Sequence, residues 1–307
     1  MQRKSEAMKA MILAAGLGTR LRPLTFTRPK ALMPVGNRPM IDRVIEYLKE
    51  YNTDEIIVNA HHHKEQLVAH LDKDRPFGLN IRVKVEPKIL GTGGGIKNTE
   101  GFWDDKPFVV INGDILTDID LIRAYKAHQR AGNLVSLILH DCEPFNQILI
   151  NKSFDILDIA SKAYPGRLAF TGIHIIDPEI LSRIPKDRFY NIIDCYQKLI
   201  SEGHPIRGYV SKGHYWRDVG SIESYLLSNR EVLRENRMMT GPGCRIHESA
   251  RLKEWVVIGK DSSLEEGVEI RRSVLWEKVR VKKGLRVIDS IVTSSKEVRE
   301  DLVGQVL

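Results

Sequence analysis

The sequence is poor in cysteine and contains no long apolar run. Only three of its 307 residues are cysteines (Cys142, Cys195 and Cys244), and they lie far apart at spacings that match no metal-binding pattern. Scattered thiols in an odd number argue against a disulfide scaffold and are typical of a reduced, cytoplasmic protein. No apolar stretch approaches the roughly 20 residues that a membrane span needs, and residues 1–7 do not resemble a signal peptide. We therefore expect a cytoplasmic protein that does not bind a membrane.

A dense basic block is also missing, although the chain is basic overall. Its formal net charge is +7, which favours anionic ligands such as phosphates. The Lys and Arg residues are spread along the chain and do not gather with aromatic residues, so nucleic acid is not expected as a partner. The length suits one large and one small domain.

Short apolar runs alternate with helical patterns through the first two thirds of the chain. Apolar residues at helical spacing lie near 40–51, 67–71, 121–128 and 221–234. The apolar runs predicted to be strands are Met11–Ala14, Ile56–Val58, Ile81–Val85 and Phe108–Ile111. This alternation predicts an α/β fold with a Rossmann-like, mostly parallel sheet, in which ligands bind at the carboxyl ends of the strands.

The periodicity changes after Pro242. Apolar residues then recur every six positions, at Ile246, Leu252, Ile258, Leu264, Ile270 and Trp276, and a second series is interleaved at the same step. A six-residue period is typical of a parallel β-helix, and the alternative is an antiparallel tail with coincidental spacing. We predict a catalytic domain at 8–238 and a short, left-handed parallel β-helix at 239–307, which would serve as an oligomerisation or packing module.

A glycine-rich segment follows the first predicted strand. Residues 14–24 read AAGLGTRLRPL, and an RPK triplet follows at 28–30. Gly16 and Gly18 allow the backbone to approach a polyphosphate closely, while Arg20 and Lys30 offer positive charge. The order matches neither a P-loop nor a complete dinucleotide fingerprint, because the third glycine of the latter is replaced by Leu21.

Two aspartates are candidate metal ligands. Asp114 follows the apolar run Phe108–Ile111, and Asp218 follows another short hydrophobic stretch. Two carboxylates together with phosphate oxygens suit Mg²⁺, whereas the alternative is that each Asp caps a helix or a turn.

A further segment, EPKILGTGGG at 86–95, carries four glycines that allow a close approach, here to a base and ribose; the alternative is a flexible turn.

The motif GLGTR at 16–20, with Pro23, Pro29-Lys30 and Pro34, resembles that of the sugar-1-phosphate nucleotidyltransferases, and the similarity extends to the repeat tail. The resemblance implies an enzyme that joins an NTP to a sugar 1-phosphate with Mg²⁺ as cofactor. It implies catalytic roles for Arg20 and Lys30 and metal binding by Asp114 and Asp218. It also implies nucleotide binding by Ala14, Ala15, Gly16, Gly18, Thr19, Arg20, Lys30, Glu86, Gly91 and Gly94.

The sugar side departs from the family pattern. Ser161-Lys162-Ala163 stands where many relatives carry Glu-Lys-Pro, Thr171 replaces a small residue, and Asn146 stands where a glycine is often found. The sugar-phosphate contacts that the resemblance implies are Asn112, Asn146, Thr171 and Gly172. Some segments resemble mannose- or heptose-1-phosphate guanylyltransferases and others N-acetylmuramate-1-phosphate uridylyltransferases, and these interpretations stay open. A non-catalytic regulatory or assembly subunit on the same scaffold, and a second, acyltransferase activity in the tail, are the alternative functions.

Overall fold

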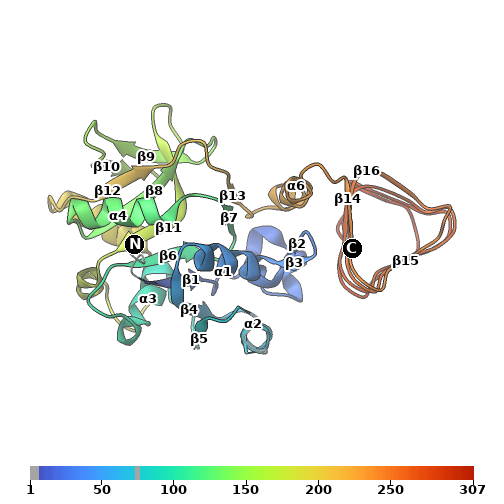
Figure 1. Ribbon diagram of the computed structural model, residues 1–307, viewed down its shortest axis with the longest axis horizontal. Coiled ribbons are helices and arrows are strands. Elements are labelled where there is room, and N and C mark those ends of the chain that lie inside the picture. Colours follow the sequence, from blue (N-terminus) through green and yellow to red (C-terminus); the bar gives the residue numbers. More distant parts are fainter. Residues whose placement is uncertain (1–6, 73–76) are drawn as a thin grey trace, which may run out of the picture. The chain divides into compact units, whose positions relative to one another are not determined.

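The computed structural model describes residues 7–72 and 77–307, which divide into two compact units (Figure 1). The first unit comprises residues 7–17, Pro29–Ala31 and Ile41–Asp218. The second comprises Gly18–Arg28, Leu32–Met40 and Val219–Leu307. The predicted phosphate segment is therefore shared between two packing environments.

The first unit is built on a nine-stranded sheet with a parallel centre. Four strands pair in parallel in the order β6-β1-β4-β5, and they form at the four apolar runs predicted from the sequence, although β1 ends one residue before Ala14. They are β1 (Met8–Leu13), β4 (Thr53–Ala60), β5 (Asn80–Val85) and β6 (Phe108–Asn112). The sheet continues beyond β6 through antiparallel β11 to β8, β9, β10 and β12: β8 (Val135–His140), β9 (Asn146–Ile150), β10 (Ile156–Ile159), β11 (Leu168–Ile176) and β12 (Arg207–Val210). The predicted α/β class is confirmed.

Helices form at the four places where the apolar spacing predicts them, and α4 shows why, whereas α3 and α5 were not predicted. Its buried residues are Leu121, Ala124, Tyr125 and His128, which lie on one side of a helix. The helix begins where Asp120 accepts a hydrogen bond from Arg123 N (3.0 Å) and ends at Gly132 with a φ of 60°. The helices are α1 (Met40–Glu50), α2 (Lys64–Leu71), α3 (Gly91–Lys97), α4 (Leu121–Ala131), α5 (Ile192–Ser201) and α6 (Ile222–Val232).

Two short strands pair the segment that contains Asp218 with the segment that follows Asp114. The strand β7 (Ile115–Thr117) pairs antiparallel with β13 (Trp216–Asp218), outside the main sheet. In this register Asp218 lies opposite Ile115, the residue after Asp114. The pairing therefore joins segments that lie about a hundred residues apart in the chain.

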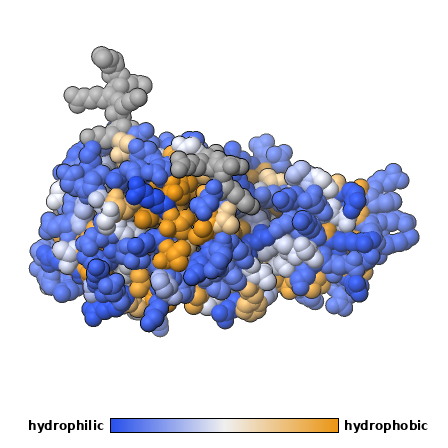
Figure 2. Space-filling view, turned by 90° about the horizontal axis from the view of Figure 1, so that it is seen from below, coloured by the Kyte–Doolittle hydropathy of each residue, from blue (hydrophilic) through white to orange (hydrophobic). Residues whose placement is uncertain are grey.

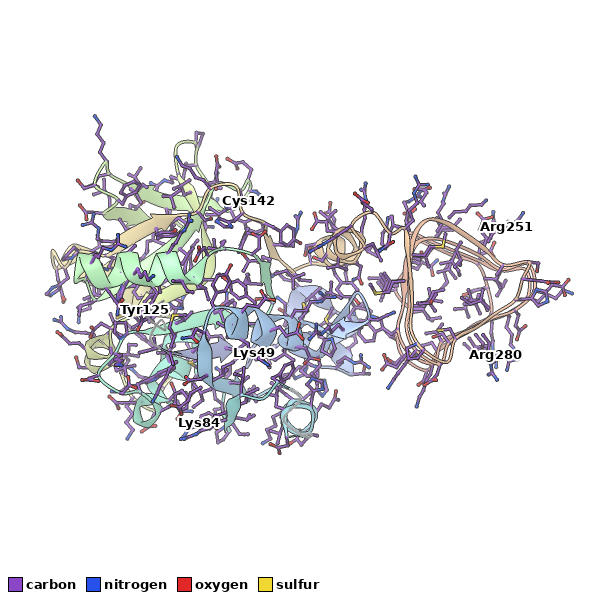
Figure 3. All side chains as sticks on the ribbon, viewed as in Figure 1. Lys49, Lys84, Tyr125, Cys142, Arg251 and Arg280 are labelled. Atoms are coloured by element: carbon purple, nitrogen blue, oxygen red, sulfur yellow. The ribbon has the colours of Figure 1, made fainter. Side chains whose placement is uncertain are left out.

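The second unit ends in coils of parallel strands, and Ile246 aligns with Leu264, Val281 and Val298 on successive coils. These partners are 18, 17 and 17 residues apart. The first coil therefore contains three six-residue steps, and each of the next two is one residue shorter. Apolar side chains fill the interior, whereas Arg251 and Arg280 point outwards (Figure 3). The strands are β14 (Met238–Thr240), β15 (Arg245–Ile246), β16 (Arg251–Ile258), β17 (Ser263–Leu264), β18 (Glu269–Leu275), β19 (Arg280–Val281), β20 (Arg286–Ile288), β21 (Ile291–Val292), β22 (Glu297–Val298) and β23 (Leu302–Val303).

The same unit holds a hairpin from the N-terminal part of the chain, formed by β2 (Pro34–Val35) and β3 (Arg38–Pro39). Within the described residues, no helix is long and apolar enough to cross a membrane. The face seen in Figure 2 is mostly hydrophilic, with one larger apolar patch and smaller apolar spots elsewhere.

Candidate active site

The site of the first unit is centred on the carboxyl ends of β1 and β6. The chain leaves β1 towards β4 on one side, whereas β6 lies on the other side, which makes this the switch point where ligands bind in open α/β sheets. Gly113 N donates to Leu13 O at 2.9 Å. A Cβ atom on Gly113 would lie 3.1 Å from Leu13 O and 3.5 Å from Ala14 Cβ. Glycine at 113 therefore lets the loop after β6 lie against the start of the phosphate segment.

A buried network holds Ala14 in place. Asn59, at the end of β4, accepts a hydrogen bond from Ala14 N (2.7 Å) and donates to Glu86 Oε1 (2.7 Å). Leu90 N donates to the second carboxylate oxygen of Glu86 at 3.2 Å. Burial raises the pKa of Glu86, which is 1% exposed, and the two hydrogen bonds oppose that rise. Glu86 thus fixes the loops after three neighbouring strands.

Asn59 was missed in the sequence analysis. A polar residue at the carboxyl end of an apolar strand was the available signal, because Asn59 follows the run Ile56–Val58 directly. Asn59 is only 2% exposed, so it holds the neighbouring loops in place and is not itself available at the surface.

Lys30 and Asp114 form an ion pair between their Nζ and Oδ2 atoms, both within the first unit. Their side chains are 16% and 18% exposed, so the pair is screened less than a surface pair. Asp218 lies on the strand that pairs beside Asp114. The structure therefore pairs Lys30 with Asp114 and places Asp218 on the strand next to them.

Gly18, Thr19 and Arg20 belong to the second unit. Gly18 has a φ of 63°, a left-handed conformation that favours glycine, and its carbonyl accepts a hydrogen bond from Thr25 Oγ1 (2.9 Å). Thr19 and Arg20 are exposed. Within the part of the chain that the structure describes, the Arg20 guanidinium has no ion pair or hydrogen bond, which leaves its donors available to an anion.

The glycine string at 91–95 forms a helix, α3, where the sequence suggested a close approach to a ligand or a flexible turn. A Cβ atom would lie 2.7 Å from Tyr190 O at Gly91 and 2.6 Å from Arg188 O at Gly94. Tyr190 O also accepts hydrogen bonds from the amides of Gly93 (2.9 Å) and Gly94 (3.1 Å). These glycines thus make room for the segment that precedes α5, a packing role that local sequence does not reveal.

On the predicted sugar side, Asn112 and Gly172 lie together. Gly172 has a φ of 73°, and a Cβ atom there would lie 2.6 Å from Asn112 Nδ2. The half-buried Asn112 ends β6 two residues before Asp114. Glycine at 172 therefore leaves space for the Asn112 amide.

The side chains of Thr171 and Asn146 have partners within the protein. Thr171 is fully buried, and its hydroxyl donates to Ile138 O at 2.8 Å. Asn146 accepts from Cys142 N (3.0 Å) and donates to Asp141 Oδ1 (2.8 Å), which closes the turn before β9. These contacts shape the backbone around the site.

Comparisons with known proteins show the family and the fold. The family model described as nucleotidyl transferase matches residues 9–235. A UTP–glucose-1-phosphate uridylyltransferase from Synechocystis sp. is 30% identical over 93% of this chain and 87% of its own length. A mannose-1-phosphate guanyltransferase from Candida albicans is 31% identical over 93% of this chain and 86% of its own. The crystal structure of HddC from Yersinia pseudotuberculosis, complexed with GMP-PN, supports the fold, with a TM-score of 0.65 at 24% identity over 73% of this chain and 99% of that one.

Proposed function

This chain belongs to the nucleotidyl transferase family as a sugar-1-phosphate nucleotidyltransferase, and on that premise we propose that its reaction takes place around Lys30, Asp114 and Asp218. The observation that carries the proposal is the Lys30–Asp114 ion pair beside Asp218, at the switch point of the sheet. An NTP and a sugar 1-phosphate would be the substrates, and an NDP-sugar and pyrophosphate the products.

The donor set suits Mg²⁺. Asp114 already contacts a cation, the Lys30 ammonium, and Asp218 supplies a second carboxylate from the paired strand. In the described residues no group of three or more His, Cys, Asp or Glu side chains could hold a metal ion. Two carboxylates with water and substrate phosphates are a shell that Mg²⁺ accepts. Such an ion would supply charge neutralisation on the phosphate oxygens.

The chain's own residues would position and neutralise the substrates. A phosphate oxygen of the sugar 1-phosphate forms a bond to the α-phosphorus of the NTP as the bond to the β-phosphate oxygen breaks, and pyrophosphate leaves with the electron pair. The attacking group is already an anion, so no side chain needs to remove a proton. Lys30 and Arg20 would oppose the charge on the phosphates, and the backbone at 14–19 would bind the NTP.

Several finer features belong to the same proposal. Mannose 1-phosphate with GTP is the first pair to test, because the Candida albicans relative carries that name, and an N-acetylmuramate 1-phosphate with UTP is the second. The parallel coils would form a left-handed hexapeptide-repeat β-helix through which copies of the chain could associate. The three free cysteines of the chain suit a cytoplasmic enzyme of nucleotide-sugar biosynthesis.

The test is pyrophosphate release with Mg²⁺, in which the four NTPs and dTTP are crossed with a panel of sugar 1-phosphates. Asp114→Asn should lower kcat by at least roughly a hundredfold for the active pair, because charge stabilisation at the phosphates is lost. The surface variant Asp158→Asn, whose carboxylate pairs with Arg167, is the matched control and should retain full activity. Full turnover by Asp114→Asn would refute the assignment of this site.

A further inference from the structure

The segment that carries Gly18–Arg20 packs within the second unit, together with α6 and the C-terminal coils. Leu21 and Leu24, which belong to this segment, are fully buried. The hairpin that follows is fastened at three places: Tyr225 Oη donates to Pro34 O (2.5 Å), Gly36 N to Asn229 Oδ1 (2.9 Å) and Asn37 Nδ2 to Ile258 O (2.8 Å). The C-terminal third of the chain therefore supports residues from its first forty.

Arg28 is the charged member of this attachment. Its guanidinium forms an ion pair with Glu277 through both terminal nitrogens and donates to Ser294 Oγ at 2.9 Å. It also lies over the Trp276 ring, 4.6 Å from the ring centroid. The side chains of Arg28 and Glu277 are 21% and 25% exposed, so the forked pair is substantially desolvated.

Trp276 extends this contact into the core of the unit. The indole is 1% exposed, and its Nε1 donates to Tyr225 Oη at 2.8 Å. Tyr225 in turn bonds Pro34 O. Arg28 and Pro34 are thereby held by one continuous set of side chains from α6 and the coils.

A direct role for Arg28 in phosphate binding does not fit these contacts. Both of its terminal nitrogens donate to Glu277 or Ser294, and one face of its guanidinium lies over Trp276. Arg20, eight residues earlier, is exposed and has no such partners among the residues that the structure describes. The two arginines thus differ, since the Arg28 guanidinium is held by protein partners whereas that of Arg20 has none among the described residues.

We propose that Arg28 and Glu277 are positioning residues for the nucleotidyl transfer, which fix the Gly18–Arg20 segment on the C-terminal coils. This inference rests on the proposed function, because it assigns Gly18–Arg20 to the NTP phosphates. The coils are then part of the machinery that binds NTP, beyond any role in assembly.

The test compares Glu277→Gln, Arg28→Lys and the double variant with wild type by steady-state kinetics and by calorimetric titration with NTP in Mg²⁺. Asp301→Asn is the matched control, since Asp301 forms an exposed ion pair with Arg286 on the same coils (2.7 Å). Each single variant should weaken NTP affinity and raise the KM for NTP on the order of tenfold, the equivalent of one charge-assisted hydrogen bond, while the KM for the sugar phosphate stays unchanged. The double variant should be no worse than either single one, because the two side chains act as a unit.

All assays are run at a temperature where circular dichroism shows every variant folded. A lower Tm with wild-type NTP affinity and KM would overturn the proposal, since Arg28 and Glu277 would then be structural only. A wild-type protein that turns over while Glu277→Gln matches it in NTP binding refutes this inference and leaves the proposed function intact. A wild-type protein that binds NTP but is silent with every sugar phosphate refutes the proposed function, and the binding comparison still decides the role of Glu277. A wild-type protein that binds no NTP overturns both.

Discussion

Replacing Asn59 with aspartate should make the stability of the protein depend strongly on pH. Asn59 Nδ2 lies 2.7 Å from Glu86 Oε1, and in Asn59→Asp a carboxylate oxygen takes its place. Two ionised carboxylates at this separation repel each other by about 6 kcal/mol at an effective dielectric constant of about 20. The alternative is that the pair holds one proton, as adjacent carboxylates in proteins do.

The size of the penalty follows from that proton. Keeping one aspartate protonated costs about 1.4 kcal/mol for each pH unit above its ordinary pKa of about 3.9, hence about 1.5 kcal/mol at pH 5 and about 5 kcal/mol at pH 7.5. Since this is less than the repulsion, the folded variant binds the proton and the unfolded chain releases it. Stability therefore falls as pH rises, by up to about 1.4 kcal/mol per pH unit.

Urea unfolding, followed by circular dichroism at pH 5 and at pH 7.5, measures this penalty relative to wild type. The double variant Asn59→Asp with Glu86→Gln is the control, because it exchanges acid and amide between the two positions. The amide introduced at position 86 can then donate to the carboxylate introduced at position 59 and still accept from Leu90 N. That carboxylate accepts from Ala14 N as well, so every hydrogen bond of the network is kept. We expect the double variant within about 1 kcal/mol of wild type and without the added pH dependence. A single variant with equal penalties at both pH values, or a double variant no more stable than the single one, would refute the network.

Two glycine substitutions test the close contacts of the site, each against a glycine with open space around it. Gly172→Ala should cost about 1–2 kcal/mol for its positive φ and, by displacing Asn112, should also raise the KM for the sugar phosphate several-fold. Gly166→Ala, also at positive φ but with nothing within 4 Å, should lose stability alone; equal KM values for both variants would contradict the role of Asn112. Gly94→Ala should lower the free energy of unfolding by about 1–3 kcal/mol in urea, whereas Gly101→Ala, in open space, should change it by less than about 0.5 kcal/mol. Equal effects at these two positions would show that the packing of α3 tolerates a methyl group.

The strands and most helices could be predicted because their periodicity is local. A run such as Phe108–Ile111 is apolar throughout because a central parallel strand is covered on both faces, and β6 forms there. The six-residue step of the tail was likewise visible in the sequence, because each coil needs apolar residues at the same positions to fill its interior. Ile246 aligns with Leu264 as that step predicts. The structure shows this stacking in parallel strands.

The contacts that organise the site could not be predicted in the same way, because they join residues far apart in the chain. Lys30 meets Asp114 across 84 positions, and Asn59 meets Glu86 across 27. The glycines of α3 could not be interpreted for a different reason. A glycine indicates that another group packs close to the backbone, but the sequence does not reveal which group that is. At Gly94 the approaching group is the backbone at Arg188, although the composition equally suited a nucleotide.

The glycine-rich motif is continuous in sequence, yet its residues draw their support from two separate units. Gly16 and Lys30 pack in the first unit, whereas Gly18 and Arg20 pack in the second. The position of Lys30 should therefore be sensitive to substitutions in the sheet of the first unit. The position of Arg20 should be sensitive to substitutions in the C-terminal coils. A motif match predicts which residues meet the phosphates, but the packing decides which distant residues hold them in place. For this chain we therefore expect the chemistry to depend also on Asn59 and Glu277, neither of which belongs to the motif.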